Sequence, residues 1–365
     1  MSGAPRGLSV LSGLSALSGL NGLIRPGRRG VLARRKPRSP RSPQPGPPSR
    51  AAVKRGGDLR AWAELLRLPA LFTVPGDALA GAAAAGVRPN SRTLLAIGSS
   101  LCLYEAGMAL NDWADHAEDA EERPHRPLPS GRIRPAAALT AAGVLTAAGL
   151  ALASRAGRRP LAVAGALAAT VWSYDLVLKR TPAGPPAMAA ARGLDLLLGG
   201  AASGGDTRKA VPSALTLAAH TLAVTTVSRH ETRGGSPLPP LTALAATTAL
   251  TWSLTRDTGK DTSRDTAFTD RPSLTDRPSL KPVLNIASLG GALTALYAAT
   301  SARPLVHAVL NPSPPLTQRA VGGGVRAMIP LQAALAARSG APVTALLTVA
   351  LAPAARRFGR KVSVT

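Results

Sequence analysis

The feature that most constrains the fold is a series of ten apolar segments, each 15–19 residues long. They span residues 68–86, 93–111, 136–154, 160–178, 186–204, 211–229, 239–255, 283–301, 320–337 and 341–355. A helix needs about 17–25 apolar residues to cross a bilayer, so most of these segments have a spanning length. None shows the alternation typical of a half-buried strand. The pattern predicts an all-α fold, a multi-span transmembrane helical bundle of nine or ten helices.

Polar stretches divide the chain further. Residues 1–56 are predicted to be a disordered basic tail, because Arg, Pro and Ser dominate its second half. Residues 57–358 form the predicted membrane domain. Within it, residues 256–281 are a polar insert in which the hexapeptide Thr-Asp-Arg-Pro-Ser-Leu occurs twice in tandem, and we expect a loop there. Residues 359–365 are predicted to be a short C-terminal tail.

The net charge of +25 raises the question of a nucleic-acid partner. Thirteen of the 44 Lys and Arg lie in residues 1–60, and no aromatic platform for base stacking accompanies the rest. A basic arm beside a membrane is attracted to anionic lipid and retained in the cytoplasm. We therefore expect membrane lipid and no nucleic acid as a partner, and a multi-pass protein of the cell membrane. A single cysteine, Cys102, excludes an intramolecular disulfide.

The predicted orientation of the protein in the membrane follows from the basic tail. If it is cytoplasmic, the loops after even-numbered segments are cytoplasmic too, namely 112–135, 179–185 and 229–238. Lys and Arg are only weakly biased between these loops and the others, so the orientation depends on the tail. The three loops hold nearly all the unusual polar residues of the membrane domain. This clustering predicts a site on the cytoplasmic membrane face.

The first of these loops carries three carboxylates at helical spacing. Asp112, Asp115 and Asp119 are i, i+3 and i+7, so on a helix they share one face. Carboxylates this close repel one another unless a cation neutralises them, and hard oxygen ligands suit Mg²⁺. Arg123 and Arg126 follow, and arginine pairs well with phosphate oxygens. The pattern predicts a diphosphate cradle; the plain alternative is a solvated helix end whose acids and arginines pair with each other.

The motif Asn-Asp-x-x-Asp-x-x-x-Asp at 111–119, followed by Arg-x-x-Arg-Pro-Leu-x-x-Gly at 123–131, resembles the first signature of the UbiA family of membrane prenyltransferases. The resemblance covers roughly residues 58–358. It implies a helical membrane enzyme that moves an isoprenoid chain from its diphosphate to an acceptor with Mg²⁺. Carried over by position, it implies metal ligands at Asp112, Asp115 and Asp119, catalytic roles for the first two, and diphosphate contacts from Asn111, Arg123 and Arg126.

The second loop and the fifth segment add four candidates. Tyr174 and Lys179 are similar to a Tyr and a Lys of the family, which implies that Tyr174 faces the allylic cation and Lys179 binds a diphosphate oxygen. A lysine at this place also suits an interfacial, snorkelling side chain. Arg192 and Asp195 stand where the family usually has Arg-x-x-Asn, which implies substrate-binding positions. A structural ion pair at i, i+3 is the alternative reading of these two residues.

The third loop departs from the family pattern, which usually has two aspartates four residues apart. Glu231 is the only acid in Ser-Arg-His-Glu-Thr-Arg-Gly-Gly at 228–235. We expect Glu231 as a metal ligand and Arg229 as a substrate contact, and either Arg229 or Arg233 as the residue that replaces metal charge on the diphosphate. His230 is expected to be a polar loop residue. This variant resembles a less characterised bacterial branch, the EboC-like proteins, more than the ubiquinone or menaquinone enzymes.

The predicted function is Mg²⁺-dependent transfer of a prenyl group from a prenyl diphosphate to a small or lipid-soluble acceptor within the membrane. A transporter is one alternative, although its charges would be expected near the midplane. A catalytically weak family member that acts as a membrane scaffold is the other, and the reduced third loop is its support. The acceptor stays open between an aromatic acid, a quinone precursor, a polyol and a phospholipid-type alcohol. The prenyl chain length stays open as well.

Overall fold

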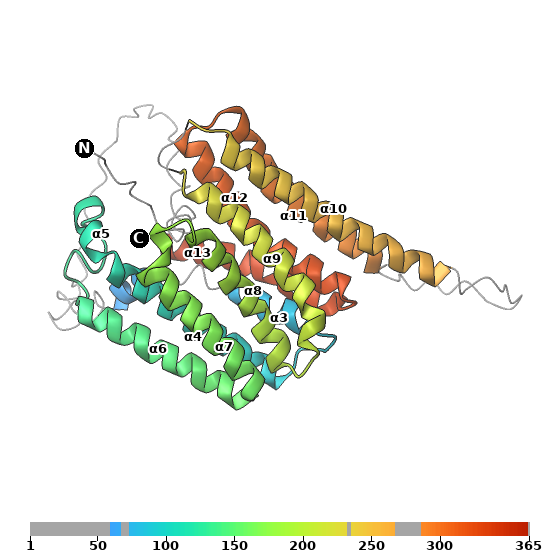
Figure 1. Ribbon diagram of the computed structural model, residues 1–365, viewed down its shortest axis with the longest axis horizontal. Coiled ribbons are helices and arrows are strands. Elements are labelled where there is room, and N and C mark those ends of the chain that lie inside the picture. The colour runs from blue at the N-terminus through green and yellow to red at the C-terminus, as the bar shows by residue number, and fades with distance from the viewer. Residues whose placement is uncertain (1–58, 67–72, 232–234, 267–285, 364–365) are drawn as a thin grey trace, which may run out of the picture.

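The structure is a computed structural model that describes residues 59–66, 73–231, 235–266 and 286–363 (Figure 1). Its helices are α3 (Val74–Ala84), α4 (Ser91–Ala114), α5 (His116–Glu122), α6 (Pro135–Ala156), α7 (Arg158–Leu176), the 3₁₀ turn η2 (Leu178–Arg180), α8 (Gly184–Ala202), α9 (Thr207–Ser228), α10 (Leu238–Thr266), α11 (Ile286–Leu310), α12 (Pro314–Arg338) and α13 (Pro342–Ser363). A short helix at 59–65 precedes them. The predicted tail, 1–56, and the tandem hexapeptides lie outside the described residues.

The prediction of a multi-span helical bundle is confirmed. Within the described residues, each of the ten apolar segments overlaps one of the helices α3, α4 and α6–α13, and these residues contain no strand. Four helices are long and apolar enough to cross a membrane by length and composition alone: α4, α6, α9 and α12. The others in the bundle are shorter or carry more polar residues, and they pack against these four.

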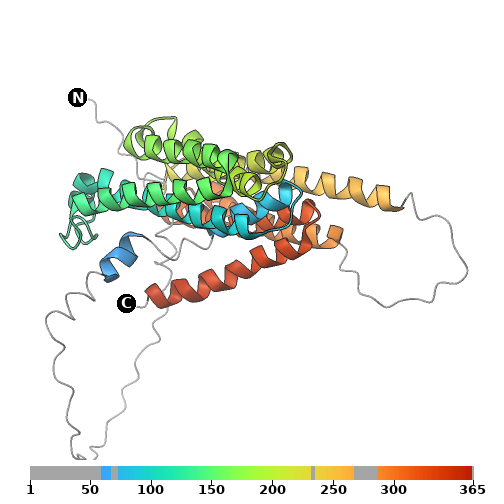
Figure 2. The same ribbon diagram turned by 90° about the horizontal axis from the view of Figure 1, so that it is seen from below.

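Two boundaries differ from the sequence prediction. The loop expected over 256–281 begins later, because α10 continues to Thr266, and α13 continues to Ser363, through most of the expected tail of 359–365. No proline stands between Pro240 and Pro272 to stop α10, so the helix extends past its apolar part. Both views show the end of α10 projecting beyond the neighbouring helices (Figures 1 and 2).

Local sequence explains where the helices that carry the site begin and end. Asn90 caps α4: its side chain accepts hydrogen bonds from the backbone of Arg92 and Thr93, and the Thr93 hydroxyl accepts one from the Asn90 amide. Gly157, with φ of 135°, makes the tight turn from α6 into α7. These devices fix the start of α4 and hold α6 and α7 beside it.

Helices α3 and α8 approach each other through glycine. A Cβ on Gly81 would stand 1.9 Å from the carbonyl oxygen of Leu196, and one on Gly199 would stand 2.4 Å from the backbone of Ala78. Small residues of this kind let helix backbones come close in lipid. The contact brings the polar residues of α3 and α8 together in the core of the bundle.

The three loops predicted to share a membrane face do meet at one end of the bundle. In Figure 1, α5, the end of α7, the start of α8 and the end of α9 all lie toward the left. The guanidinium of Arg180, on η2, contacts both Asp115 and Glu118, and that of Arg229 donates to the carbonyl oxygen of Thr181 at 2.7 Å. These contacts join the first loop to the second and the second to the third.

Candidate active site

The three aspartates of the first loop lie at a break between two helices. α4 ends at Ala114, Asp115 caps it, and α5 begins at His116. The amide of Asp115 still donates to the carbonyl of Asn111, and the amide of Asp119 donates to that of Asp115, so the helical turn is nearly continuous. Asp112, Asp115 and Asp119 therefore stay on one side of the chain, and all three are buried. Buried carboxylates require compensation by positive charge or hydrogen bonds.

Arginine side chains of the same loop supply part of that compensation. The Nη1 atom of Arg126 lies 2.6 Å from Oδ2 of Asp119 and 3.8 Å from Oδ1 of Asp112. Arg123 lies farther away, with its Nη1 atom 3.6 Å from Asp119. Arg126 is thus the cation that bridges two of the three predicted metal-binding carboxylates.

The second loop completes the compensation. The Nζ atom of Lys179 lies 2.6 Å from Oδ1 of Asp115, and its side chain is only 7% exposed. Arg180 reaches the same oxygen at 3.2 Å with a side chain that is 56% exposed. Lys179 is therefore a buried partner of the acidic motif, and the alternative of a snorkelling lysine does not describe it.

The third loop lies nearby but contributes less charge. Glu231 is buried, and its Oε1 atom has no hydrogen-bond partner among the described residues. Burial raises the pKa of the Glu231 carboxyl to about 7. His230 bonds through its ring to the Thr226 carbonyl, as expected of a polar loop residue. Arg229 is held by the second loop, so it stands at the edge of the charged face.

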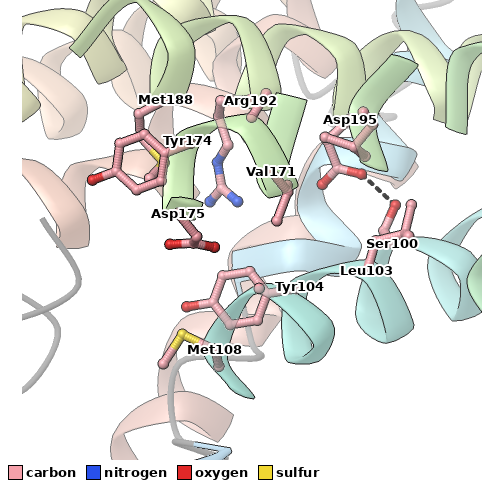
Figure 3. Close-up of a pocket in the computed structure, with 13 residues that line it drawn as sticks. Ser100, Leu103, Tyr104, Met108, Val171, Tyr174, Asp175, Met188, Arg192 and Asp195 are labelled. Atoms are coloured by element: carbon pink, nitrogen blue, oxygen red, sulfur yellow. Dashed lines mark hydrogen bonds between the residues drawn. The ribbon is translucent and has the colours of Figure 1, made fainter. Parts of the chain in front are cut away.

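A cavity of about 100 Å³ lies between α4, α7 and α8 (Figure 3). Its lining is mostly apolar, and comprises Ser100, Leu103, Tyr104, Gly107, Met108, Leu167, Val171, Tyr174, Asp175, Met188, Ala191, Arg192 and Asp195. Tyr174, predicted to face the reacting cation, is buried in this wall. The cavity therefore offers an apolar space with a few polar groups at its boundary.

A buried polar cluster lies beside this cavity, deep in the bundle. The Nη1 atom of Arg192 lies 3.0 Å from the carboxylate of Asp77, which also accepts a 2.6 Å hydrogen bond from Gln332. Asp195 accepts a short hydrogen bond from Ser100. Arg192 and Asp195 thus have partners on α3, α4 and α12. The structure places both in the cavity wall, and Arg192 also contacts Met328 on α12.

The charged face and the cavity meet at one hydrogen bond. The Nδ2 atom of Asn111 donates to Oδ1 of Asp175 at 3.0 Å, and Asp175 is itself a cavity-lining residue. Asp175 was not among the predicted site residues, and neither were Asp77 and Gln332. Asp175 follows Tyr174 directly, and a carboxylate in the last turn of an apolar segment is the signal that could have found it. Asp77 and Gln332 lie 255 positions apart, and nothing in the sequence joins them.

The oxygen atoms of the acidic motif are suitable ligands for a hard cation such as Mg²⁺. Asp112, Asp115 and Asp119 offer only carboxylate oxygens, and the buried Oδ1 atom of Asn111 has no hydrogen-bond partner in the described part of the chain. The described residues contain no group of three or more His, Cys, Asp or Glu already converged on a single point. Each acid instead bonds a cationic side chain, so a bound divalent ion would take the place of Arg126 and Lys179.

A bundle of apolar helices with such a charged end defines a helical membrane protein with an internal site. The model of the UbiA prenyltransferase family matches residues 71–256, just over half of the chain. The chain belongs to this family, which confirms the resemblance read from the motifs. The match includes α4, α7, α8 and the three loops of the charged face.

Curated relatives point the same way. The chain is 34% identical over 129 residues to a digeranylgeranylglyceryl phosphate synthase of Methanopyrus kandleri, over 34% of this chain and 46% of that protein. It is also 34% identical over 148 residues to a protein of that name from Methanothrix thermoacetophila, over 40% of this chain and 53% of that one. The chain thus spans about half the length of the curated relatives it matches.

Solved structures agree in fold. A UbiA homolog from Archaeoglobus fulgidus, bound to GPP and Mg²⁺, is similar with a TM-score of 0.52 at 17% identity, covering 81% of this chain and 99% of that one. A UbiA homolog from Aeropyrum pernix is similar with a TM-score of 0.51 at 17% identity, covering 77% and 96%. At these identities the likeness shows a shared fold.

Proposed function

We propose that this protein transfers a prenyl group from a prenyl diphosphate to a hydroxyl-bearing, lipid-soluble acceptor within the membrane, with Mg²⁺ as cofactor. One observation carries the proposal: a face of buried acids and cations adjoins an apolar cavity at the Asn111–Asp175 hydrogen bond. A prenyl diphosphate has the same two parts, a highly charged head and an apolar chain. Family membership and the names of the curated relatives support this reading.

The proposed metal-binding residues are Asp112, Asp115 and Asp119, with Glu231 as a further candidate. Mg²⁺, when bound, supplies the positive charge that these carboxylates need. Arg126 and Lys179 pair with Asp119 and Asp115, and with a metal bound to these acids both side chains would be available to diphosphate oxygens. Asn111, Arg123 and Arg229 are proposed as further contacts to the diphosphate.

The two parts of the site then divide the chemistry. Cationic side chains around the diphosphate stabilise the negative charge that develops on it as the C–O bond breaks. The cavity between α4, α7 and α8 holds the prenyl chain of the substrate and excludes water from the allylic cation. The ring of Tyr174 lines this cavity, where an aromatic face stabilises positive charge. Arg192 and Asp195 are proposed to contact the substrate from the deeper wall.

The acceptor is proposed to be a lipid alcohol of the glyceryl phosphate class. The curated relatives are named as digeranylgeranylglyceryl phosphate synthases, and this name supports that class over an aromatic acid or a quinone precursor. The third loop, with a single acid at Glu231, is the feature that favours the EboC-like branch, and we keep that assignment as a proposal. The basic N-terminal tail supports a cell-membrane location with the charged face on the cytoplasmic side.

The experiment uses the full chain purified in lipid nanodiscs. Geranylgeranyl diphosphate, labelled in the prenyl chain, is incubated with geranylgeranylglyceryl phosphate and Mg²⁺, and both lipid product and released diphosphate are measured. The proposal predicts product in equal amount to diphosphate, with loss of both on chelation of the metal. Released diphosphate without a prenylated lipid would refute the acceptor class. The absence of both activities, with a panel of shorter and longer prenyl diphosphates, would refute the reaction.

A matched pair of variants ties the activity to the site. Asp112→Asn removes a buried carboxylate of the charged face, whereas Glu121→Gln removes an exposed one on α5. The proposal predicts a loss of at least about a hundredfold for the first, in the range of an electrostatic group at a reacting centre, and less than twofold for the second. Equal activities for the two variants would show that the aspartate motif is not the site.

A further inference from the structure

Asp175 is the acidic side chain at the point where the charged face meets the cavity. It lies in the last turn of α7, it is 2% exposed, and it lines the cavity together with Tyr174. We propose that Asp175 is the base that takes the proton from the acceptor hydroxyl as the new ether bond forms. This inference depends on the proposed function, because it names the residue that completes that reaction.

The two carboxylate oxygens of Asp175 have different surroundings. Oδ1 is held by the Nδ2 atom of Asn111 at 3.0 Å, which fixes the carboxylate in place. Oδ2 faces α4 at Gly107, since a Cβ built there would stand 3.8 Å from it. Asp175 and Gly107 both line the cavity, so Oδ2 lies against α4 at the cavity wall. In the view of Figure 3, the Asp175 carboxylate is drawn among the side chains of Tyr174, Tyr104 and Arg192.

The other acids of the region are less suitable as a base. Asp195 also lines the cavity, but it is bound to Ser100, which lies 11 residues before Asn111 on α4, about 16 Å along the helix. Asp115 and Asp119 are paired with cations at 2.6 Å and do not line the cavity. Asp175 therefore combines access to the cavity with proximity to the diphosphate face.

The charges around Asp175 suit this role as well. Lys179 lies one turn farther along the chain, and its Nζ atom is 2.6 Å from Asp115, so Asp175 adjoins the charged residues of the site. A carboxylate in this position can accept a proton from a hydroxyl that reaches the cavity next to the diphosphate face.

The C–O bond between the prenyl carbon and the diphosphate breaks, and its electron pair leaves with the diphosphate. The acceptor oxygen donates a lone pair to that carbon and forms the ether bond. Its O–H bond then breaks, and the proton passes to Oδ2 of Asp175, from which it leaves to the diphosphate or to water. No oxidant or reductant is needed.

The test separates bond breaking from proton removal. In the nanodisc assay with Mg²⁺, wild type and Asp175→Asn are compared for two rates: release of diphosphate with water as the only nucleophile, and transfer to geranylgeranylglyceryl phosphate. General base catalysis contributes about 10²–10⁴-fold, so transfer should fall by at least about a hundredfold. Release to water, which needs no base to form the cation, should stay within about fivefold. Loss of both rates together would assign Asp175 to substrate positioning and overturn the proposal.

A thiol acceptor gives the second arm. The analogue in which the attacked hydroxyl is replaced by SH is largely an anion above about pH 10.5, because an alkyl thiol is somewhat less acidic than the cysteine thiol, whose pKa is about 8.5. With this acceptor, Asp175→Asn should recover to within about fivefold of wild type at the same pH. A variant that stays a hundredfold slower with the thiolate would overturn the proposal. An inactive wild type would instead refute the proposed function, so the two failures are distinguishable.

Discussion

The side-chain amide of Asn111 donates a 3.0 Å hydrogen bond to the carboxylate of Asp175, and this bond joins the two halves of the site. Asn111 belongs to the acidic motif at the end of α4, whereas Asp175 belongs to the wall of the apolar cavity. Both residues are buried. The contact between α4 and α7 therefore sets the position of the charged face relative to the cavity.

Lys179 and Arg180 contact the same oxygen of Asp115 but differ in burial, which gives a matched comparison. Lys179→Met should raise the Kd for a prenyl diphosphate roughly tenfold to a hundredfold, because hydrogen bonds to charged groups contribute about 1.5–3 kcal/mol. Arg180→Met should change the Kd by less than about fivefold, since an exposed ion pair contributes at most about 1 kcal/mol. Titration of a non-hydrolysable prenyl thiolodiphosphate measures both. Equal effects would contradict a special role for the buried lysine.

The cavity should be sensitive to one added methyl group at Gly107. A Cβ there would stand 2.9 Å from Cγ1 of Val171, so Gly107→Ala should overpack the cavity wall at a cost of about 1–3 kcal/mol and weaken prenyl diphosphate binding roughly tenfold. Val171→Ala in the same chain should restore binding. Gly143→Ala, where nothing lies within 4 Å, is the control and should bind normally. If Gly107→Ala alone binds the prenyl diphosphate normally, the prenyl chain lies outside this cavity.

The ion pair between Arg192 and Asp77 should be a determinant of stability. Asp77 is fully buried, so Arg192→Met leaves an uncompensated carboxylate and should cost about 3–5 kcal/mol in the free energy of unfolding. Adding Asp77→Asn should recover most of that loss. Thermal unfolding in detergent, followed by tryptophan fluorescence, checks the order of stabilities. A double variant no more stable than Arg192→Met would argue against this pair.

Glu231 predicts a pH dependence of stability. Its pKa is raised from 4.5 to about 7 by burial, so the ionised form opposes folding. The stabilising contribution of the Glu231 carboxyl to the free energy of unfolding is fully present below pH 4.5. It is lost as the pH rises through 7, and the loss is up to about 3 kcal/mol. Glu231→Gln should therefore be more stable than wild type at pH 8.5 and nearly equal at pH 4.5. The exposed Glu122→Gln serves as a control and should show no such trend. A wild type and Glu231→Gln with parallel pH profiles would contradict a buried, ionisable Glu231.

The helices could be predicted from sequence because each is a separate apolar segment between polar stretches. The cluster of three loops was predictable as well, since alternate loops of a membrane bundle share a face. The polar contacts in the core could not be predicted from the sequence. Gln332 and Asp77 meet only through the packing of α12 against α3, and no local pattern encodes that contact. The extent of α10 was also missed, because apolar content ends before the helix does.

The role of Asp175 was missed for a related reason. Its neighbour Tyr174 carries the resemblance to the family, so the sequence predicts a site role for the tyrosine alone. Consecutive residues on a helix point about 100° apart, and only the packing of α7 against α4 decides which of them meets Asn111. Sequence reasoning found the correct turn of helix, and the tertiary structure identified the residue.

The most direct test of the account maps where the prenyl chain lies. A geranyl diphosphate analogue with a photoreactive diazirine at the chain end is irradiated in nanodiscs with Mg²⁺, and the labelled peptides are sequenced by mass spectrometry. The account predicts labels on Leu103, Leu167 or Val171, in the cavity between α4 and α7, and their loss with excess unlabelled geranyl diphosphate or in Asp112→Asn. Labels on lipid-facing residues such as Val144 or Leu215, unaffected by competitor, would contradict it.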